Sequence, residues 1–498
     1  MSKFEELKEY YKDIKRLNGI NALLGWDQEV NMQEYNSLEG RSKQVSLVQK
    51  LIHQRLTSEK LGNLLKQSQK INNLNEIDQA ILRETKREYD LATKLPEELV
   101  MEIAETSILA AQKWRKARQE NDFSVFESIL KNTVDLQLKQ AEYLQTHTDP
   151  YSTLIDLYEP GATYDWISKI FKEIKPKLIE TVKKLNSSSD KPDGSILKKK
   201  YDIDKQFNLS FDIIKQLNFD LGMGRQDRST HPFTTTISSG DVRITTRTAK
   251  EYLNECIFGT IHECGHALYE MGINKDFNET ILAEGTSMGI HESQSRMWEN
   301  FVGRSKEFWL YWYPTFQKYF PKILKDYPLE EFYRAINIVE PTFIRVNADE
   351  VTYGLHIILR FEIERDLIHG KIDVSDLPDL WNKKFDDLLG ITPPTDTVGV
   401  LQDIHWSMGS IGYFPTYFLG TLYAAQFYNY ILDKIPDLPN QYEKGEFSNL
   451  LSFLRQNIHQ YGRMYRAREL VQRVTNEDLN PQYFLDYIKN KFYPIYRI

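Results

Sequence analysis

Two histidines and a glutamate near the middle of the chain have the spacing of a metal-dependent hydrolytic centre. Residues 262–266 read His-Glu-Cys-Gly-His, which is the pattern His-Glu-x-x-His. Residues four apart project from the same face of a helix, so His262 and His266 can bind one ion at about 2.0–2.1 Å. Glu263 can then act as the general base toward a water molecule that the ion activates, without being a ligand. The pattern predicts a zinc peptidase centre on a buried helix.

The small residues between the two histidines carry further information. A glycine inside a helix costs about 1 kcal/mol relative to alanine, so Gly265 indicates that another element approaches closely there. We expect Cys264 to be a buried packing group rather than a thiolate ligand. Cys256 and Cys264 lie eight residues apart on the same predicted helix. That separation is too long for a disulfide bond, so we expect no disulfide framework.

A catalytic zinc site needs a third protein ligand and one open position for water. The metzincin spacing is excluded, because the positions three and six residues after His266 are Tyr269 and Gly272 instead of glycine and histidine. The candidates in the segment that follows are Glu284, His291, Glu292 and Glu299. Spacing alone leaves these four open.

Helical periodicity dominates the rest of the chain. Apolar residues recur at helical spacing in Phe4–Leu24, Ala80–Leu91, Trp166–Leu185, Leu329–Val339 and Leu450–Arg463. Such amphipathic segments predict an α-rich protein. Two segments rich in turn-forming residues and without periodicity, Asn186–Ser195 and the run near Ile435–Gly445, predict surface loops.

One segment directly before the metal motif departs from the helical pattern. Residues His231–Arg247 place threonine-rich and β-branched runs on both sides of the turn Ser238-Ser-Gly-Asp. This composition predicts a short β-hairpin.

Composition and charge exclude several classes of protein. The chain has 498 residues, of which 41% are apolar and 27% charged, as in ordinary soluble globular proteins. The formal net charge of −8 argues against a nucleic-acid partner, which normally requires a basic patch. Acidic residues interrupt the first eight positions and no window reaches transmembrane length, so we expect a cytoplasmic location and no membrane partner.

Motifs distributed over almost the entire chain strengthen this interpretation. They are Leu23–Gln28, Gly224–Phe233, Asp241–Thr245, His262–His266, His291–Arg296, Ile344–Asp349 and Gly399–Trp406. In this order the chain resembles the thermostable carboxypeptidase family (carboxypeptidase Taq type, peptidase family M32). It departs from the family after the first motif, where Met32-Gln33 replaces the usual Met-Pro.

The resemblance implies an architecture and a metal-binding set. The expected fold is all-α, a single large helical clam-like domain over residues 1–498 with a deep substrate groove and a small β-sheet near the active site, assembled as a homodimer. The family's metal-binding glutamate corresponds to Glu292, beside His262 and His266. The implied cofactor is one Zn²⁺ per chain, which Co²⁺ or another divalent ion can replace. An extended peptide could lie along the edge of the sheet as an added strand.

The sequence does not assign the side chain that orients a ligand histidine. Related zinc peptidases often carry an acid four residues after the ligand glutamate, and here that position is Arg296.

The oxyanion of the tetrahedral intermediate needs a donor in addition to the metal. By resemblance to the helical peptidases, the candidates are His405, Tyr413 and Tyr417. The alternative is packing, because the chain contains 29 tyrosines. His231 and His356 are equally consistent with core histidines and with substrate contacts.

Two arginines are candidates for binding the terminal carboxylate of a peptide, because a planar guanidinium group matches two carboxylate oxygens. They are Arg243 and Arg345. The resemblance places Arg345, in Ile-Arg-x-x-Ala-Asp, at the closed end of the groove, with Gln402 and Asp403 lining the same end. The alternative is a structural ion pair with Asp241, Asp349 or Glu350.

The sequence therefore predicts a zinc-dependent carboxypeptidase that removes residues one at a time from peptides with a free C-terminal carboxylate, with broad side-chain specificity. One alternative is a helical zinc oligopeptidase that cleaves internally and needs no carboxylate anchor. Another is a binding protein with structural zinc. Structural zinc usually has four protein ligands, commonly cysteines, and this chain has only two cysteines.

Overall fold

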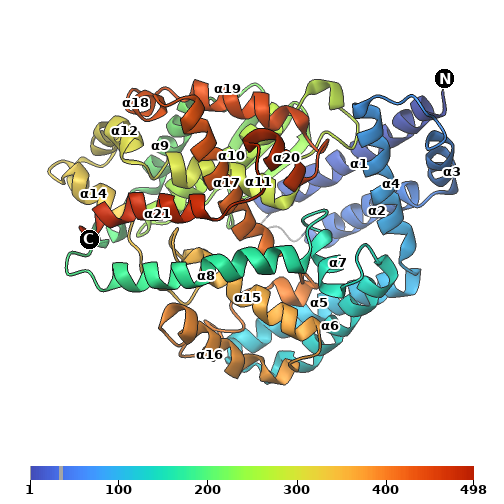
Figure 1. The fold of residues 1–498 in the computed structure, drawn as a ribbon, viewed down its shortest axis with the longest axis horizontal. Helices are drawn as coiled ribbons and strands as arrows, with labels where there is room; N and C mark the ends of the chain where they lie inside the picture. Colours follow the sequence, from blue (N-terminus) through green and yellow to red (C-terminus); the bar gives the residue numbers. More distant parts are fainter. Residues whose placement is uncertain (1, 33–36) are drawn as a thin grey trace. The chain divides into compact units, whose positions relative to one another are not determined.

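The computed structural model describes residues 2–32 and 37–498, so Gln33 of the departing motif lies outside the described residues. The chain divides into two compact units, each built from three separate stretches of sequence. Unit 1 comprises residues 1–93, 193–336 and 427–478, and unit 2 comprises residues 94–192, 337–426 and 479–498. The ribbon in Figure 1 is coloured along the sequence, so each of these stretches can be located by its residue numbers. Because each unit is discontinuous, neither forms a contiguous block in the sequence.

Unit 1 contains the predicted metal motif. Its helices and strands are α1 (Lys3–Asn31), α2 (Leu38–Leu56), α3 (Glu59–Ser68), α4 (Glu76–Lys94, whose last residue belongs to unit 2), α9 (Ile203–Gln216), β1 (Gly224–Arg228), β2 (Thr234–Ser238), β3 (Asp241–Thr246), α10 (Leu253–Gly272), α11 (Met288–Arg296), α12 (Lys306–Tyr319), α13 (Pro321–Leu324), α14 (Leu329–Ile336), α18 (Leu438–Tyr442), α19 (Ser448–Asn457) and α20 (Ala467–Thr475). Short 3-10 helices lie at η1 (Ser195–Lys198), η2 (Lys275–Phe277) and η7 (His459–Tyr461), and a π-helix, η3, spans Met297–Val302.

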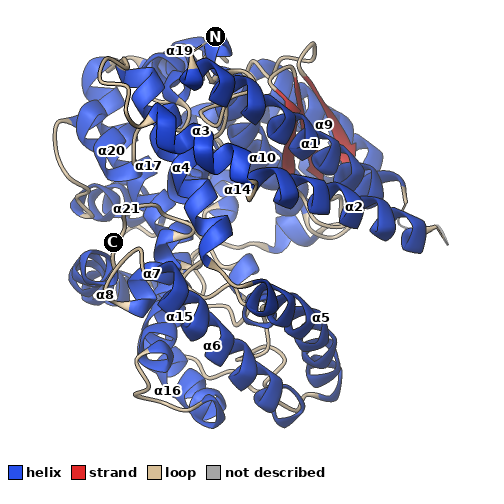
Figure 2. Ribbon diagram, turned by 90° about the vertical axis from the view of Figure 1, so that its right-hand side faces the viewer, coloured by secondary structure: helices blue, strands red, loops and turns tan. Residues whose placement is uncertain are grey.

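The three strands form one small sheet in unit 1 in the order β1-β3-β2. β1 pairs with β3 in parallel, and β2 pairs with β3 antiparallel, with a register irregularity between Thr236 and Ser238. Along β3 the inward residues Val242 and Ile244 are fully buried. Helix α10 packs against β3 and β2, and α1 packs against β2 (Figure 2). The sheet therefore lies directly against the helix that carries the metal motif.

Unit 2 is helical throughout. It contains α5 (Glu97–Glu120), α6 (Ser124–Leu144), α7 (Pro150–Asp156), α8 (Tyr164–Asn186), α15 (Tyr353–Ile368), α16 (Leu377–Leu389), α21 (Gln482–Ile495) and the 3-10 helices η4 (Arg345–Asn347), η5 (Val374–Asp376) and η6 (His405–Met408). The long apolar helix α17 (Pro415–Lys434) begins in unit 2 and ends in unit 1.

Most of the predicted elements are confirmed. The all-α class with a small sheet is correct, and β2 and β3 form the predicted hairpin. Strand β1 was not predicted, because its sequence Gly-Arg-Gln-Asp-Arg is polar and pairs with β3 rather than with a sequence neighbour. The segment Leu329–Val339 is helical only to Ile336, and Leu450–Arg463 only to Asn457 before a 3-10 turn. The predicted loop near Ile435–Gly445 contains the short helix α18, so that part of the prediction is wrong.

None of the described helices has both the length and the apolar character needed to cross a bilayer.

Candidate metal centre and carboxylate-binding cluster

Close packing of α10 against α11 brings the candidate metal ligands together. A Cβ atom added at Gly265 would lie 2.7 Å from the Cα atom of Ser295 and 2.8 Å from the carbonyl oxygen of Gln294. Any larger residue would therefore push the two helices apart. Ser287 caps the N-terminus of helix α11, since its hydroxyl accepts a hydrogen bond from the backbone N–H of Ile290. The close approach predicted from the glycine is confirmed, and it brings Glu292 up to the two histidines of α10.

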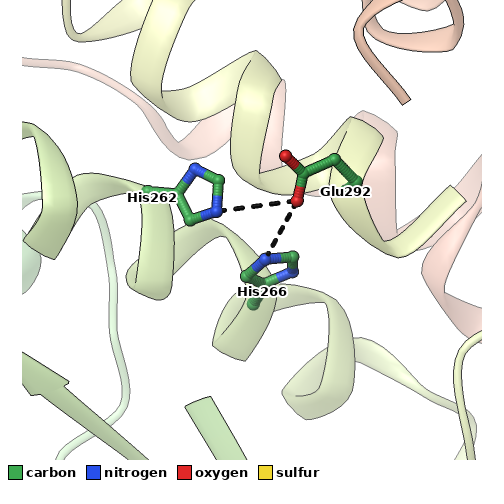
Figure 3. A group of neighbouring side chains, drawn as sticks. All are labelled: His262, His266 and Glu292. Carbon is green, nitrogen blue, oxygen red and sulfur yellow. Dashed lines mark ion pairs between the residues drawn. The ribbon is translucent and has the colours of Figure 1, made fainter. Parts of the chain in front are cut away.

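Figure 3 shows the imidazoles of His262 and His266 and the carboxylate of Glu292 converging on one point. Their ligand atoms all lie within 4.8 Å of one another, and they form the one such group found in residues 2–32 and 37–498. The Oε2 atom of Glu292 lies 3.6 Å from Nε2 of His262 and 3.5 Å from Nε2 of His266. Two ligands at about 2.0–2.1 Å from a tetrahedral ion are about 3.4 Å apart. The spacing and the donor set of two imidazoles and one carboxylate thus fit a catalytic zinc site.

The second ring nitrogen of His262 contacts Glu299. The Nδ1 atom lies 2.9 Å from Oε2 of Glu299. Glu299 belongs to the π-helix η3, where the extra residue in the turn alters which side chains face α10. Because Nδ1 donates its proton to this carboxylate, the lone pair of Nε2 faces the candidate metal position. Glu299 therefore supplies the orienting acid that the sequence did not assign.

His266 is oriented by a chain of two further side chains. Its Nδ1 atom lies 2.5 Å from Nδ1 of His291, and Nε2 of His291 lies 2.8 Å from Oε1 of Glu270. The tautomers are assigned by letting Nδ1–H of His266 donate to Nδ1 of His291 and Nε2–H of His291 donate to Glu270. Burial lowers the pKa of His266 to about 3, so the imidazole is neutral and able to bind a cation.

Two arginines stabilise the carboxylates of this centre. Nε of Arg296 donates to Oε1 of Glu292 at 2.7 Å, and its Nη1 lies 3.2 Å from Oε2 of Glu299. Arg304 approaches Oε1 of Glu299 at 3.5 Å. Burial opposes ionisation, but the positive charge of Arg296 holds the pKa of Glu292 well below its usual range and lowers the pKa of Glu299 to about 2.

Glu263 lies on α10 between the two histidines and is 8% exposed. Its Oε2 atom accepts a hydrogen bond from the Thr234 hydroxyl at 2.7 Å. Burial raises the pKa of Glu263 above its usual value, whereas His262 and the hydrogen bond from Thr234 lower it. A buried carboxylate with one fixed oxygen and one remaining oxygen can accept a proton from a neighbouring water molecule.

The other three candidates for the third ligand lie elsewhere. Glu299 and His291 contact the Nδ1 atoms of His262 and His266, whereas Glu292 faces their Nε2 atoms. Glu284 is engaged by Lys15 at 2.5 Å and by Arg463 at 2.9 Å. Cys256 and Cys264 are both buried free thiols on α10, and burial raises the pKa of Cys256 to about 11 and that of Cys264 still further. Cys264 is therefore a packing residue, as predicted.

Unit 2 contains a second buried polar cluster, centred on Arg345. The guanidinium group of Arg345 binds Asp403 with two hydrogen bonds, 3.1 Å from Nε to Oδ2 and 3.0 Å from Nη2 to Oδ1. Asp403 is also paired with Arg360. Arg345 and Arg360 are 5% and 1% exposed. Burial opposes ionisation, but the two arginines hold the pKa of Asp403 well below its usual range.

Arg345 retains hydrogen-bonding capacity beyond Asp403. Its Nη1 donates to the hydroxyl of Tyr353 at 2.9 Å, and its backbone N–H donates to Oε1 of Gln402 at 2.8 Å. A guanidinium group has five N–H donors. Within the described part of the chain, three of them are used, which leaves one on each Nη atom. This pair of donors is suited to a carboxylate.

The three candidates for the oxyanion donor lie in the same unit. The ring of His405 packs against Tyr413 and Phe414, with centroids 5.4 and 4.6 Å apart. Burial lowers the pKa of His405 to about 4, and its Nδ1 atom is buried without a hydrogen-bond partner in the described residues. The hydroxyls of Tyr413 and Tyr417 are 3.4 Å apart, and the ring of Tyr417 lies 5.1 Å from the Arg345 guanidinium carbon.

Arg243 is placed differently from Arg345. It lies on β3 opposite Thr235, and its guanidinium group binds Asp241 with two 2.8 Å hydrogen bonds and lies over the ring of Trp26. Alternation along the strand directs Arg243 away from the face that packs on α10. The ion pair with Asp241 is the structural alternative considered from the sequence, and a role for Arg243 in substrate binding stays a prediction.

Burial distinguishes His231 from His356, the two histidines for which the sequence left a core role and a substrate contact equally open. His231 is exposed, which excludes a core role. His356 is fully buried in α15, and burial lowers its pKa to about 3, as expected of a core histidine.

Sequence reasoning missed several partners of these sites. Arg360 carries a usable signal, because it is a charged residue within the apolar run Leu355–Phe361 of α15. Thr234 and Glu270 carry none, since they contact residues 29 and 21 positions away, and neither does Tyr353, because its partner Arg345 lies eight residues earlier in a different helix.

Comparisons with known proteins agree on one family. The family model described as Carboxypeptidase Taq (M32) metallopeptidase matches residues 6–492. Carboxypeptidase 1 of Bacillus subtilis is 39% identical over 493 residues, covering 98% of both chains, and thermostable carboxypeptidase 1 of Pyrococcus furiosus is 40% identical over 484 residues, covering 97% of both. The crystal structure of the M32 carboxypeptidase from Deinococcus radiodurans matches with a TM-score of 0.97 at 35% identity, covering 100% of both chains. A structure of the Pyrococcus furiosus carboxypeptidase, described as Apo-Mg, matches with a TM-score of 0.96 at 39% identity over 99% of both chains.

Proposed function

The chain belongs to the carboxypeptidase Taq (M32) family of metallopeptidases and is a metal-dependent carboxypeptidase that acts on peptides, and from this premise we propose that it uses zinc, with His262, His266 and Glu292 as ligands and Glu263 as the general base. The observation that carries the proposal is the convergence of these three ligands beside a buried carboxylate that is held from one side. This is the arrangement that metal-assisted hydrolysis of a peptide bond requires.

When bound, a divalent ion polarises the scissile carbonyl group and lowers the pKa of a water molecule to about 7. Glu263 takes the proton from the attacking water and later delivers it to the leaving amine. Glu299 and His291 keep the Nε2 atoms of the ligand histidines directed at the ion, and Arg296 keeps Glu292 ionised. Arg296 thus keeps Glu292 charged beside His266, whose imidazole is kept neutral by burial.

We assign recognition of the substrate's terminal carboxylate to Arg345. The cluster of Arg345, Arg360 and Asp403 contains two buried cations and one anion, so it has a surplus of one positive charge. A buried uncompensated charge is unfavourable, and a carboxylate ligand would neutralise it. Gln402 orients the backbone of Arg345, and Asp403 fixes the plane of its guanidinium group.

His405, Tyr413 and Tyr417 are the proposed sources of the oxyanion donor. Burial raises the pKa of Tyr417 well above its usual value, so its hydroxyl stays protonated and can donate. Broad side-chain specificity is proposed because the residues assigned here address the carboxylate and the scissile bond rather than a side chain. The homodimer and the cytoplasmic location stay predictions, which light scattering and fractionation of cells would test.

The direct test combines metal analysis with a peptide-digestion assay. Freshly purified protein should contain about one zinc ion per chain, and a chelated sample should recover activity with Zn²⁺ or Co²⁺; Mg²⁺ serves as the comparison ion. An N-terminally blocked ten-residue peptide should yield a ladder of single-residue losses from its C-terminus. Two internal fragments would instead support the oligopeptidase alternative.

A further inference from the structure

Strand β2 presents two hydroxyl groups to the helix that carries the metal motif. Thr234 and Thr236 are two residues apart, so their side chains lie on the same face of the strand. They pair with Ile244 and Val242 of β3, whose buried side chains mark the face that packs on α10. Glu263 and Glu270 are seven residues apart on α10, which is about two helical turns, and therefore share one face of that helix.

Thr234 contacts the proposed general base directly. Its hydroxyl lies 2.7 Å from Oε2 of Glu263 and 2.9 Å from the carbonyl oxygen of the same residue. A hydroxyl has one proton to donate, and the carboxylate is both the nearer and the more strongly accepting group. The bond occupies Oε2 and so restricts rotation of the carboxylate about its terminal torsion angle, which is otherwise broad.

Thr236 contacts the other polar chain of the centre. Its hydroxyl lies 3.2 Å from Oε2 of Glu270, and Oε1 of the same carboxylate accepts from Nε2 of His291. His291 in turn contacts Nδ1 of His266. Strand β2 therefore contacts the proposed base directly, through Thr234. Through Thr236 it is connected to His266, a proposed metal ligand, by way of Glu270 and His291.

We propose that β2 is a positioning strand, in which Thr234 orients the carboxylate of Glu263 for proton transfer and Thr236 orients the Glu270–His291 pair that directs His266 toward the metal. The inference rests on the proposed roles of Glu263 and His266. Neither threonine is a catalytic residue, because each acts through another side chain.

The chain offers a matched control on the same strand. Thr235 lies between the two threonines but pairs with Arg243, on the opposite face. Replacing threonine by valine removes the hydroxyl and keeps the β-branched shape, so Thr234→Val, Thr235→Val and Thr236→Val disturb the strand equally and differ only in the hydrogen bond that is lost.

The Thr234 arm is tested by steady-state kinetics on the metal-loaded enzyme. Thr234→Val should lower kcat about 10-fold or more with KM within about twofold, because a hydrogen bond to a charged group is lost. Thr234→Ser should restore most of kcat, and Thr235→Val should resemble wild type. Equal losses in Thr234→Val and Thr235→Val, or no recovery with serine, would show a merely structural strand and overturn the proposal.

A double-mutant cycle separates this inference from the proposed function. If Thr234 acts through Glu263, adding Thr234→Val to Glu263→Gln should cause no further loss of kcat. A fully additive loss would overturn the positioning role while leaving Glu263 as the base. If Glu263→Gln itself retains activity, it is the proposed function that fails.

The Thr236 arm has a readout that is independent of activity. Thr236→Val should raise the dissociation constant for Zn²⁺, measured by chelator competition, about threefold or more, which is less than loss of a direct partner of a ligand would cause. Thr234→Val and Thr235→Val should leave that constant unchanged. An unchanged constant in Thr236→Val would refute this arm.

Discussion

The metal centre of unit 1 and the Arg345 cluster of unit 2 are both buried and polar, but their charges are unbalanced with opposite signs. The metal centre holds four carboxylates, from Glu263, Glu270, Glu292 and Glu299, against two guanidinium groups, from Arg296 and Arg304. When both imidazoles are neutral, as binding of a metal ion requires, the centre has two negative charges in excess. The Arg345 cluster holds two guanidinium groups against one carboxylate.

The difference indicates what each region binds. Burying a charge without a partner is costly, and folded proteins usually pair such charges or bind an ion or ligand that compensates them. An excess of two negative charges fits a divalent cation, and an excess of one positive charge fits a single carboxylate. The opposite signs of the two imbalances are thus consistent with the roles proposed for them, metal binding in unit 1 and carboxylate binding in unit 2.

The largest effect is expected from removing a proposed metal ligand of the unit 1 centre. His266→Ala and Glu292→Ala should lose metal and activity together, with metal affinity reduced by more than the roughly 10–100-fold typical of a lost partner of a ligand. Glu284→Ala is the control, because Glu284 is an acid of the same segment that is bound to Lys15 and Arg463 instead. Full metal occupancy and activity in Glu292→Ala would show that the third ligand is a different residue.

A loss of catalysis without loss of metal is expected for Glu263→Gln. The amide keeps the shape of the side chain but cannot accept a proton, and removing a general base lowers the rate by about 10²–10⁴-fold. Metal content and kcat should be measured on the same preparation. Turnover within about tenfold of wild type would exclude Glu263 as the base.

The next prediction concerns the Arg345 cluster. For a substrate capped as a C-terminal amide, kcat/KM should be roughly 30-fold lower or more, because a buried charge-assisted pair loses about 2–5 kcal/mol when one partner is removed. Arg345→Ala should lower kcat/KM for the free-acid substrate by a similar factor and lower kcat/KM for the amide far less. Arg345→Lys keeps the charge but loses the planar fork, so it should recover only part of the activity.

The same pair of substrates distinguishes the two candidate arginines. Arg243→Ala, tested in parallel, provides the comparison for Arg345→Ala. If Arg345→Ala affects acid and amide equally while Arg243→Ala affects only the acid, the anchor is Arg243.

A smaller effect is expected on stability, from Glu364 in unit 2. It is fully buried and accepts hydrogen bonds from Trp406, Tyr151 and the backbone of Gly412, yet burial raises its pKa to about 7. Because the pKa of Glu364 in the folded state lies above the ordinary glutamate value of about 4.5, the protonated carboxyl stabilises the fold. That contribution is complete below about pH 4.5 and is lost as the pH rises through about 7, up to about 3 kcal/mol.

Glu364→Gln should remove this pH dependence. Thermal unfolding of both proteins from pH 4.5 to 8 would show the stability of wild type falling relative to the variant. The readout is the slope of stability against pH, because the amide also alters the hydrogen bonds of this side chain and so shifts stability by an amount that does not depend on pH. Parallel curves would contradict the raised pKa of Glu364.

The sequence by itself determined the features that depend on local spacing. The i, i+4 rule placed His262 and His266 on one face of a helix with Glu263 between them, and Gly265 indicated the close approach that α11 makes. Threonine-rich and β-branched runs on both sides of the turn Ser238–Asp241 predicted the β2–β3 hairpin. These inferences hold because helical and strand periodicities relate residues that are only a few positions apart.

Only the tertiary structure decided which distant residues meet. Spacing left Glu284, His291, Glu292 and Glu299 equivalent, and the packing of α10 against α11 and the π-helix gave each a different partner. The pairing of Arg345 with Asp403, 58 residues away, was likewise undetermined, and Arg360 was not foreseen at all. The physical reason is that periodicity decays over a few turns, whereas these contacts depend on how whole helices pack.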